Sequence, residues 1–254
     1  MQVASAPSNF ISGLGEFIRR NGHGFLVSAV VAAAAKFLSE HYGAPAMLMA
    51  LLLGIAFHFL AEEEDGICKP GIDFTSRTVL RFGVALLGAR ISVELMIGLG
   101  PQLIAVVVVG VVLTILFGLL GARLLKRGWR LGLLTGGSVA ICGASAAMAI
   151  SAVLPKNEHS ERNLIFTVLA VTVLSTIAMI IYPILTKVFE FNDEVSGVFL
   201  GGTIHDVAQV VGAGFSVSEE TGEVATLVKL IRVAMLAPVV LVISILVRRH
   251  SSDT

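Results

Sequence analysis

Apolar runs long enough to cross a lipid bilayer constrain this chain more than any other feature. One run, from about residue 98 to 122, holds no charged side chain, and a helix needs ~20 residues to cross the hydrocarbon core. The residues are 56% hydrophobic and 14% charged, with a mean hydropathy of +0.90, far from soluble composition. The alternation of about ten residues that is typical of membrane strands does not occur. We therefore predict an all-α, polytopic membrane protein built as a helical bundle.

About eight spans are predicted along the chain. Residues 1–22 come before them and are polar and weakly amphipathic, which predicts a cytoplasmic or interfacial N-terminal segment. Residues 23–250 are predicted to form a single transmembrane domain. The spans lie at about residues 23–39, 44–61, 74–92, 98–122, 131–154, 163–187, 195–215 and 224–247.

The distribution of lysine and arginine predicts that both termini lie in the cytoplasm. The basic cluster at residues 123–130 follows the fourth span, and an even number of spans separates it from the basic residues near each terminus. In this count Lys156, Arg162 and the acidic loop Ser218–Glu223 lie outside. Re-entry of the fifth or seventh segment, in place of a full crossing, is the alternative that would change the count.

The stretch Leu200–Phe215 carries the strongest functional signal. It reads LGGTIHDVAQVVGAGF and places His205, Asp206 and Gln209 in an apolar context. A charge at membrane depth costs ~2.5 kcal/mol or more, so such residues face a protein interior or a watery cavity. The nearby glycines allow the helix to break, which is tolerated where the break lines a cavity or is buried in protein. We predict that this stretch is the centre of a transport pathway.

A second glycine-rich segment resembles the first. Residues 136–139 read GGSV and residues 201–204 read GGTI. Paired, glycine-interrupted apolar segments are typical of the binding site in repeat-built transporters, so these two segments are expected to form that site. The alternative for the fifth segment is close helix packing through small residues, with no ligand.

The polar residues of the seventh span suit ion coupling. Asp206 and Gln209 are three residues apart and share a helical face, so together they can coordinate a cation or carry a proton. His205 titrates near neutral pH and is a second candidate. The alternative is a structural network that ties this span to Lys229 or Arg232.

Cationic side chains within the spans favour an anionic solute. Lys229 and Arg232 share a face of the eighth span, and Arg77 and Arg81 share a face of the third. Guanidinium groups suit tetrahedral oxyanions, and a broken helix adds backbone N–H donors. Contact with lipid headgroups is the alternative for Arg77 and Arg81. The predicted anion-binding residues are Lys229, Arg232, Arg81, Ser138, Cys142, Gly143, Ser145, Gly202 and Thr203.

Enzyme signatures are absent from the sequence. HExxH, GxSxG, Walker and strand-preceded GxGxxG motifs do not occur. The two cysteines, Cys68 and Cys142, show no metal-site spacing. We expect no catalytic residues, no metal, no cofactor and no nucleic-acid partner. Without an ATP site, transport by this chain would be driven by an ion gradient.

Four strings of the sequence resemble the sulfate exporter family of bacterial multi-pass inner-membrane proteins. These are FGVALLGARIS (Phe82–Ser92), SVAICGASAAMAISAVLP (Ser138–Pro155), GGTIHDVAQVVGAG (Gly201–Gly214) and VKLIRVAMLAPVV (Val228–Val240). The resemblance implies kinship with the bile-acid/sodium and sodium/proton transporters, whose fold has inverted repeats and crossed broken helices. It also implies a location in the bacterial inner membrane. Members of that family continue beyond the position where this chain ends, so C-terminal truncation is an open alternative.

These observations predict a secondary transporter that exports sulfate or a related sulfur-containing anion, coupled to protons or sodium through His205, Asp206 and Gln209. Two alternatives stay open. One is a cation/proton antiporter in which Asp206 binds the transported ion, and the other is a membrane scaffold or accessory subunit without transport. The partners expected are the anion, the coupling ion and the lipid bilayer, with homo-oligomer formation left open.

Overall fold

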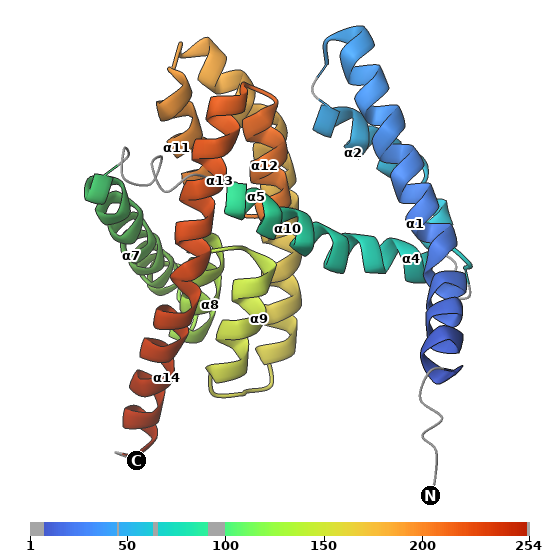
Figure 1. The fold of residues 1–254 in the computed structure, drawn as a ribbon. Helices are drawn as coiled ribbons and strands as arrows, with labels where there is room; N and C mark the ends of the chain where they lie inside the picture. Colours follow the sequence, from blue (N-terminus) through green and yellow to red (C-terminus); the bar gives the residue numbers. More distant parts are fainter. Residues whose placement is uncertain (1–7, 45, 63–65, 91–99, 253–254) are drawn as a thin grey trace, which may run out of the picture. The chain divides into compact units, whose positions relative to one another are not determined.

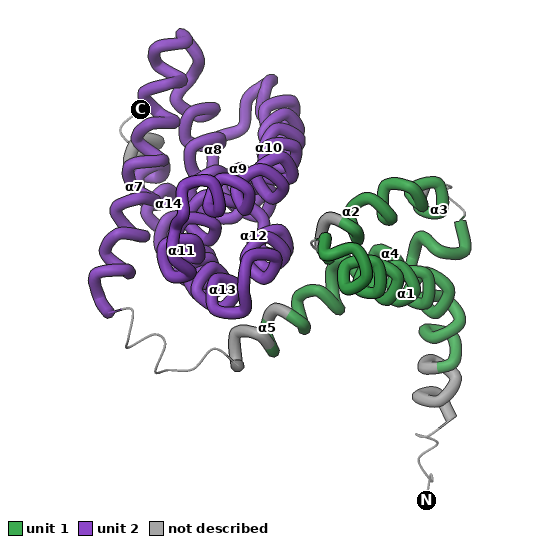
Figure 2. The backbone as a smooth tube through the Cα atoms, turned by 90° about the horizontal axis from the view of Figure 1, so that it is seen from above, with its two compact units in different colours: residues 1–87 green, residues 88–254 purple. Residues whose placement is uncertain are grey.

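The computed structural model describes residues 8–44, 46–62, 66–90 and 100–252, and every element in these ranges is a helix (Figure 1). The chain divides into two compact units, residues 1–87 and 88–254 (Figure 2). The prediction of an all-helical membrane protein is confirmed. Within the described residues, four helices are long and apolar enough to cross a membrane, compared with eight predicted spans. They are Gly15–Tyr42, Gly100–Leu124, Ser160–Val188 and Glu219–Arg248.

Unit 1 is built on one long helix, α1 (Ser8–Tyr42), which runs without interruption through the boundary predicted at residue 22. Gly24 of α1 and Gly71 of α4 lie against each other, since a Cβ on Gly71 would come 2.7 Å from the Gly24 Cα atom. A Cβ on Gly24 would come 1.9 Å from the Cys68 carbonyl oxygen. Only glycine permits this close approach. The other elements are α2 (Ala46–Ala56), α3 (Phe59–Glu62), α4 (Lys69–Phe74), the π-helical turn η1 (Thr75–Val79) and α5 (Leu80–Arg90).

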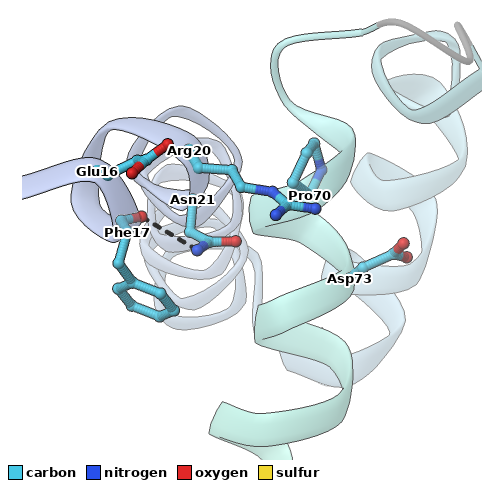
Figure 3. Close-up of a pocket in the computed structure, with 6 residues that line it drawn as sticks. All are labelled: Glu16, Phe17, Arg20, Asn21, Pro70 and Asp73. Atoms are coloured by element: carbon cyan, nitrogen blue, oxygen red, sulfur yellow. Dashed lines mark hydrogen bonds between the residues drawn. The ribbon is translucent and has the colours of Figure 1, made fainter. Parts of the chain in front are cut away.

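A surface pocket of about 460 Å³ lies between α1 and α4. Figure 3 shows Arg20 of α1 reaching toward α4, where Pro70 and Asp73 line the same pocket. The Asn21 side chain donates to the Phe17 carbonyl oxygen (3.0 Å), and the Phe17 ring meets Phe74 edge to face. None of these residues belongs to the predicted transport site.

Unit 2 contains two helical hairpins where the sequence predicted full spans. It comprises α7 (Gly100–Leu124), α8 (Trp129–Ala140), α9 (Ala144–Val153), α10 (Ser160–Val188), α11 (Asp193–Thr203), α12 (Val207–Phe215), α13 (Glu219–Ala234) and α14 (Leu236–Ser252). The helices α8, α9, α11 and α12 are 9 to 12 residues long, about half the length that a crossing requires.

The first hairpin is α8–α9, in which the chain returns to the end where it entered. Gly137 of α8 lies against Ile150 of α9, since a Cβ on Gly137 would come 2.3 Å from the Ile150 Cδ1 atom. A small pocket also joins Arg130, near the start of α8, to Leu154, just after α9. Residues 131–154 therefore fold back, as the re-entrant alternative requires.

The second hairpin is α11–α12, and both of its ends meet the start of α13. The hydroxyl groups of Ser218 and Thr221 donate to Asp193 Oδ1 (2.5 and 2.8 Å), which ties the first turn of α11 to α13. These two hydrogen bonds lower the pKa of Asp193. Near the end of α12, a Cβ on Gly214 would come 2.9 Å from the Gly222 Cα atom of α13. Residues 195–215 therefore also fold back.

The two hairpins occupy opposite halves of unit 2. Figure 1 shows α11 and α12 beside α13 in the upper half, and α8 and α9 beside α14 in the lower half. Ile150 of α9 packs in one core cluster with Ile243 of α14, whereas a Cβ on Gly201 of α11 would meet the Ala225 carbonyl oxygen of α13. Since α13 and α14 together form one candidate span, the hairpin tips meet near its middle.

Most glycines of the paired segments serve packing. Gly132 and Gly136 of α8 lie against α7, where a Cβ on Gly118 would come 2.5 Å from the Gly136 Cα atom. Gly197 and Gly201 of α11 lie in the same way against α13. Both pairs have the four-residue spacing that lets membrane helices approach closely. Packing, the alternative considered for the fifth segment, therefore explains Gly136 and Gly201.

The α8–α9 hairpin corrects the predicted side of the loop that follows it. Because α8–α9 folds back, Arg162 lies with Lys126, Arg127 and Arg130 around one pocket at the base of this hairpin. Lys156 directly precedes Asn157, which also lines this pocket. The count that placed Lys156 and Arg162 opposite residues 123–130 is wrong, because it treated residues 131–154 as a full crossing. The opposite end holds the acidic residues Glu190, Asp193, Glu194, Glu219 and Glu220. The cytoplasmic location of the basic end stays a prediction.

Cysteine labelling tests the first hairpin. In a chain with Cys68 and Cys142 replaced by alanine, Leu125→Cys and Asn157→Cys should react with a membrane-impermeant maleimide from the same side of the membrane. Glu220→Cys should react only from the other side, because α10 crosses between them. Labelling of residues 125 and 157 from opposite sides would contradict the hairpin.

Candidate functional site

The candidate site lies where the two hairpin tips meet inside unit 2. One tip is Ile141–Gly143, between α8 and α9, and the other is Ile204–Asp206, between α11 and α12. A Cβ on Gly143 would come 3.4 Å from the Cβ atom of His205, so the tips are in contact. The residues that the sequence selected from the fifth, seventh and eighth segments are thus brought to one place.

The first tip depends on one glycine. Gly143 has φ +65° and ψ −119°, a conformation that side-chain-bearing residues rarely adopt. Its N–H group donates to the Ser138 carbonyl oxygen (2.8 Å), which turns the chain back after α8. The residue before α9 is Gly143, which has no side chain to cap the helix, so the N–H groups of the first turn depend on other partners.

The second tip contains no glycine and is held by polar side chains. Asp206 is the N-cap of α12, and its Oδ1 atom accepts from the N–H groups of Ala208 (2.9 Å) and Gln209 (3.3 Å). The Ser175 hydroxyl of α10 accepts from the N–H groups of His205 and Asp206, each at 3.2 Å. The helix therefore breaks because Asp206 starts a new helix and Ser175 holds the extended turn.

Arg232 of α13 joins the two tips. Its five N–H groups make five hydrogen bonds of 2.8 to 3.3 Å, all to backbone carbonyl oxygens. These oxygens belong to Val139 and Ala140 at the end of α8 and to Gly201 and Ile204 at the end of α11. The guanidinium group is therefore the shared C-terminal cap of two helices.

Lys229, one turn before Arg232, makes the same connection. It is fully buried, and its Nζ atom donates to the Ile141 carbonyl oxygen (2.8 Å) and the Ile204 carbonyl oxygen (3.0 Å). The last carbonyl groups of a helix lack intrahelical partners and carry the negative end of the helix dipole. Two buried cations are tolerated here because two such helix ends converge on them.

An open side remains at the tips. Ser145, Gly202 and Asp206 are exposed, and a Cβ on Gly202 would meet nothing within 4 Å. Two buried polar atoms at the second tip and the start of α12, His205 Nδ1 and Gln209 Oε1, have no hydrogen-bond partner among the described residues. Buried polar groups are normally paired, so these two atoms point to a ligand, an ion or water at the tips.

The orientation of the Gln209 amide is fixed by its neighbours. The Thr176 hydroxyl donates to the Thr172 carbonyl oxygen (3.0 Å), so it can only accept from Gln209 Nε2 (3.1 Å). The Gln209 Oε1 atom is therefore the free end of the amide. It lies one helical turn from the Asp206 carboxylate, and both groups offer oxygen atoms to a cation.

The structure places the predicted anion-binding residues in different settings. Cys142 and Gly143 are buried in the first tip, Ser145 follows them in the first turn of α9, and Gly202 precedes the second tip. The hydroxyl protons of Ser138 and Thr203 are used within their own helices, on the carbonyl oxygens of Leu134 and Phe199. The donors of Lys229 and Arg232 described above are directed to carbonyl oxygens. Arg81 is exposed on α5 and belongs to unit 1, so its predicted role stays a prediction.

Ser175 and Thr176 of α10 belong to the site but were not predicted from the sequence. They hold the second tip and the Gln209 amide, respectively. Their signal was a Ser-Thr pair in the middle of an apolar span, where hydroxyl groups commonly bond to a neighbouring helix.

Replacing Arg232 should destabilise the fold. In Arg232→Gln, most of the four carbonyl oxygens lose their donor, and breaking buried charged interactions of this kind costs on the order of 3–5 kcal/mol. Chemical unfolding of the purified protein in detergent measures the loss. Lys187 is exposed, so Lys187→Gln is the control and should change the unfolding free energy by less than about 0.5 kcal/mol. Equal stability of the two variants would contradict the capping role.

Comparison with known proteins places this site in a membrane protein family. A UPF0324 membrane protein of Rhizobium meliloti (strain 1021) is 71% identical over 227 residues, which cover 89% of this chain and 65% of the relative. The UPF0324 membrane protein TauZ of Paracoccus pantotrophus is 71% identical over 226 residues, covering 89% and 66%. A relative from Chlorobaculum tepidum is 58% identical over 228 residues, covering 90% and 63%. The chain thus spans a little less than two thirds of the length of these relatives.

No solved structure matches the chain. The family profile described as Conserved hypothetical protein 698 matches residues 23–254, which include both hairpins and the helix that carries Lys229 and Arg232. The chain therefore belongs to this family, that of the UPF0324 membrane proteins.

Proposed function

We propose that this chain forms the solute site of a secondary transporter for a small sulfur-containing anion, such as sulfate or a sulfonate. The observation that carries the proposal is the meeting of two half-crossing hairpins over the buried pair Lys229 and Arg232. In membrane transporters, discontinuous helices near the midplane commonly form the solute site, and the N-terminal ends of half-helices face anionic groups.

The charges around the tips favour an anion. Lys229 and Arg232 bring two positive charges, and each helix terminus contributes about half a charge. The C-terminal ends of α8 and α11 and the N-terminal ends of α9 and α12 nearly cancel, while Asp206 brings one negative charge. A net charge of about +1 is left when all side chains are ionised. In this proposal Lys229 and Arg232 supply the field, and N–H groups at the start of α9 contact the anion.

The resemblance to sulfate exporters, together with relatives named TauZ, makes sulfate and the sulfonate taurine the first solutes to test. Asp206, Gln209 and His205 would couple movement of the anion to protons or sodium. The proposal places the protein in the bacterial inner membrane with the basic end of unit 2 in the cytoplasm.

A second candidate is a cation/proton antiporter. The Gln209 Oε1 atom has no partner among the described residues and lies one turn from the Asp206 carboxylate. It favours this candidate, because the two groups offer oxygen ligands to a cation. In that case Lys229 and Arg232 only hold the tips together.

Ligand-dependent stability of the purified chain tests the anion site. Sulfate or taurine, at constant ionic strength, should raise the unfolding free energy by about 2.7 kcal/mol at one hundred times the dissociation constant. A Cβ on Gly202 meets nothing within 4 Å, so Gly202→Leu should weaken anion binding at least tenfold and leave the unliganded stability unchanged. The control is Gly121→Leu on α7, where a Cβ also meets nothing within 4 Å. Absence of an anion effect in the unmodified chain would overturn the proposal.

The variant Asp206→Asn separates the two candidates. Asparagine is as good an N-cap as aspartate, so this change removes the charge and keeps α12. For an anion transporter in liposomes, the variant should still bind the anion and should lose the dependence of anion flux on protons or sodium. For an antiporter, sodium or pH alone should alter stability, and the variant should abolish that effect. Unchanged coupling in the variant would exclude Asp206 from the mechanism.

A further inference from the structure

A second cationic site lies at the base of the α8–α9 hairpin, at the far end of this hairpin from the tips. A pocket of about 330 Å³ is lined there by four basic residues with Trp129 and His159. The basic residues are Lys126, Arg127, Arg130 and Arg162, and none of the described residues that line the pocket is acidic. We propose that this pocket binds the phosphate headgroup of an anionic phospholipid.

The pocket contains a donor that has no partner among the described residues. The Nε atom of Arg130 is buried and makes no hydrogen bond within the described part of the chain. The Arg130 guanidinium lies 5.7 Å from the centre of the Trp129 ring, which holds it in place. The helix α8 also begins here, and its N-cap residue Gly128 has no capping side chain, so its N–H groups and positive end face the same region. A phosphodiester would satisfy both sets of donors.

The turn between α7 and α8 places a lysine where glycine is favoured. Lys126 has φ +54°, and the N–H groups of Lys126 and Arg127 donate to the carbonyl oxygens of Arg123 and Ala122. This arrangement ends many helices, usually with glycine in the left-handed position. Glu190 has the same geometry after α10, with φ +53°. At residue 126 the side chain that occupies the strained position is a cation lining the pocket.

The surroundings indicate a lipid as the source of the phosphate. Arg162 also borders a surface groove of about 540 Å³ lined by Ile165, Phe166 and Leu169, which are all more than half exposed on α10. This groove gives an acyl chain an apolar path away from the headgroup. Glu158 and Glu161 line the groove rather than the pocket, so the headgroup is directed to the cationic side of Arg162. Trp129 is 48% exposed, as tryptophans at the membrane interface commonly are.

Trp129 provides the readout, because it is the single tryptophan of the chain. The chain is reconstituted in phosphatidylcholine vesicles with equal mole fractions of brominated phosphatidylglycerol or brominated phosphatidylcholine, and quenching of Trp129 fluorescence is measured. Phosphatidylglycerol should associate at least fivefold more strongly than phosphatidylcholine. Lys126→Gly and Arg162→Gln should each lower this preference about fivefold, since each removes one basic charge near the headgroup. Lys126→Gly also suits the left-handed turn, so it should not unfold the protein.

Glu190→Gly is the matched control, because it makes the same backbone change at the opposite end of α10. It should leave the lipid preference unchanged. Equal quenching by the two brominated lipids, or an undiminished preference in both basic-residue variants, would overturn the proposal. Inorganic phosphate is the other source of the same chemistry. If millimolar inorganic phosphate abolishes the preference, the pocket binds free phosphate and the lipid assignment is wrong.

Discussion

Arg232 and Lys229 donate to the carbonyl ends of two helices at once, and the rest of unit 2 depends on this interaction. A helix that stops inside a membrane leaves polar carbonyl groups unpaired, and a cation inside a membrane lacks solvent. Each is costly alone, and together they satisfy each other: the seven hydrogen bonds from these two side chains cover the ends of both α8 and α11. The hairpins can therefore end halfway, and their tips can meet.

The two ends of each hairpin then have different roles. At the tips, the C-terminal ends of α8 and α11 are neutralised by buried cations, while the residue before α9 is a glycine without a capping side chain, beside exposed Ser145 and Gly202. This asymmetry makes the tips suitable for binding a small anion. At the base of α8–α9, basic side chains gather around Trp129 in a pocket with no acidic residue among its described lining residues, which suits a contact with anionic lipid. The proposed solute site and the proposed lipid site thus lie at opposite ends of the same hairpin.

The sequence predicted the membrane class, the helical fold and the segments that meet at the site. His205, Asp206, Lys229 and Arg232 stood out because polar groups are rare in apolar runs. Re-entry could not be decided from the sequence, because two half-helices have the same composition as one crossing helix. The capping role of Arg232 was also hidden, since its partners are carbonyl oxygens, which every residue carries, 28 to 93 positions away. Similarly, glycines suggested the helix breaks, yet Gly136 and Gly201 pack against other helices, and the second break arises from Asp206 and Ser175.

Cross-linking between the hairpin tips tests the central claim most directly. With Cys68→Ala and His205→Cys, the native Cys142 lies next to Gly143, which contacts residue 205. A short bis-methanethiosulfonate reagent, applied to membranes, should join the two cysteines and hold the chain together after cleavage at a protease site placed in residues 156–158. The same chain with Lys229→Met and Arg232→Met should not cross-link. Failure of the first chain to cross-link, or undiminished cross-linking in the second, would contradict the account in which these two cations hold the tips together.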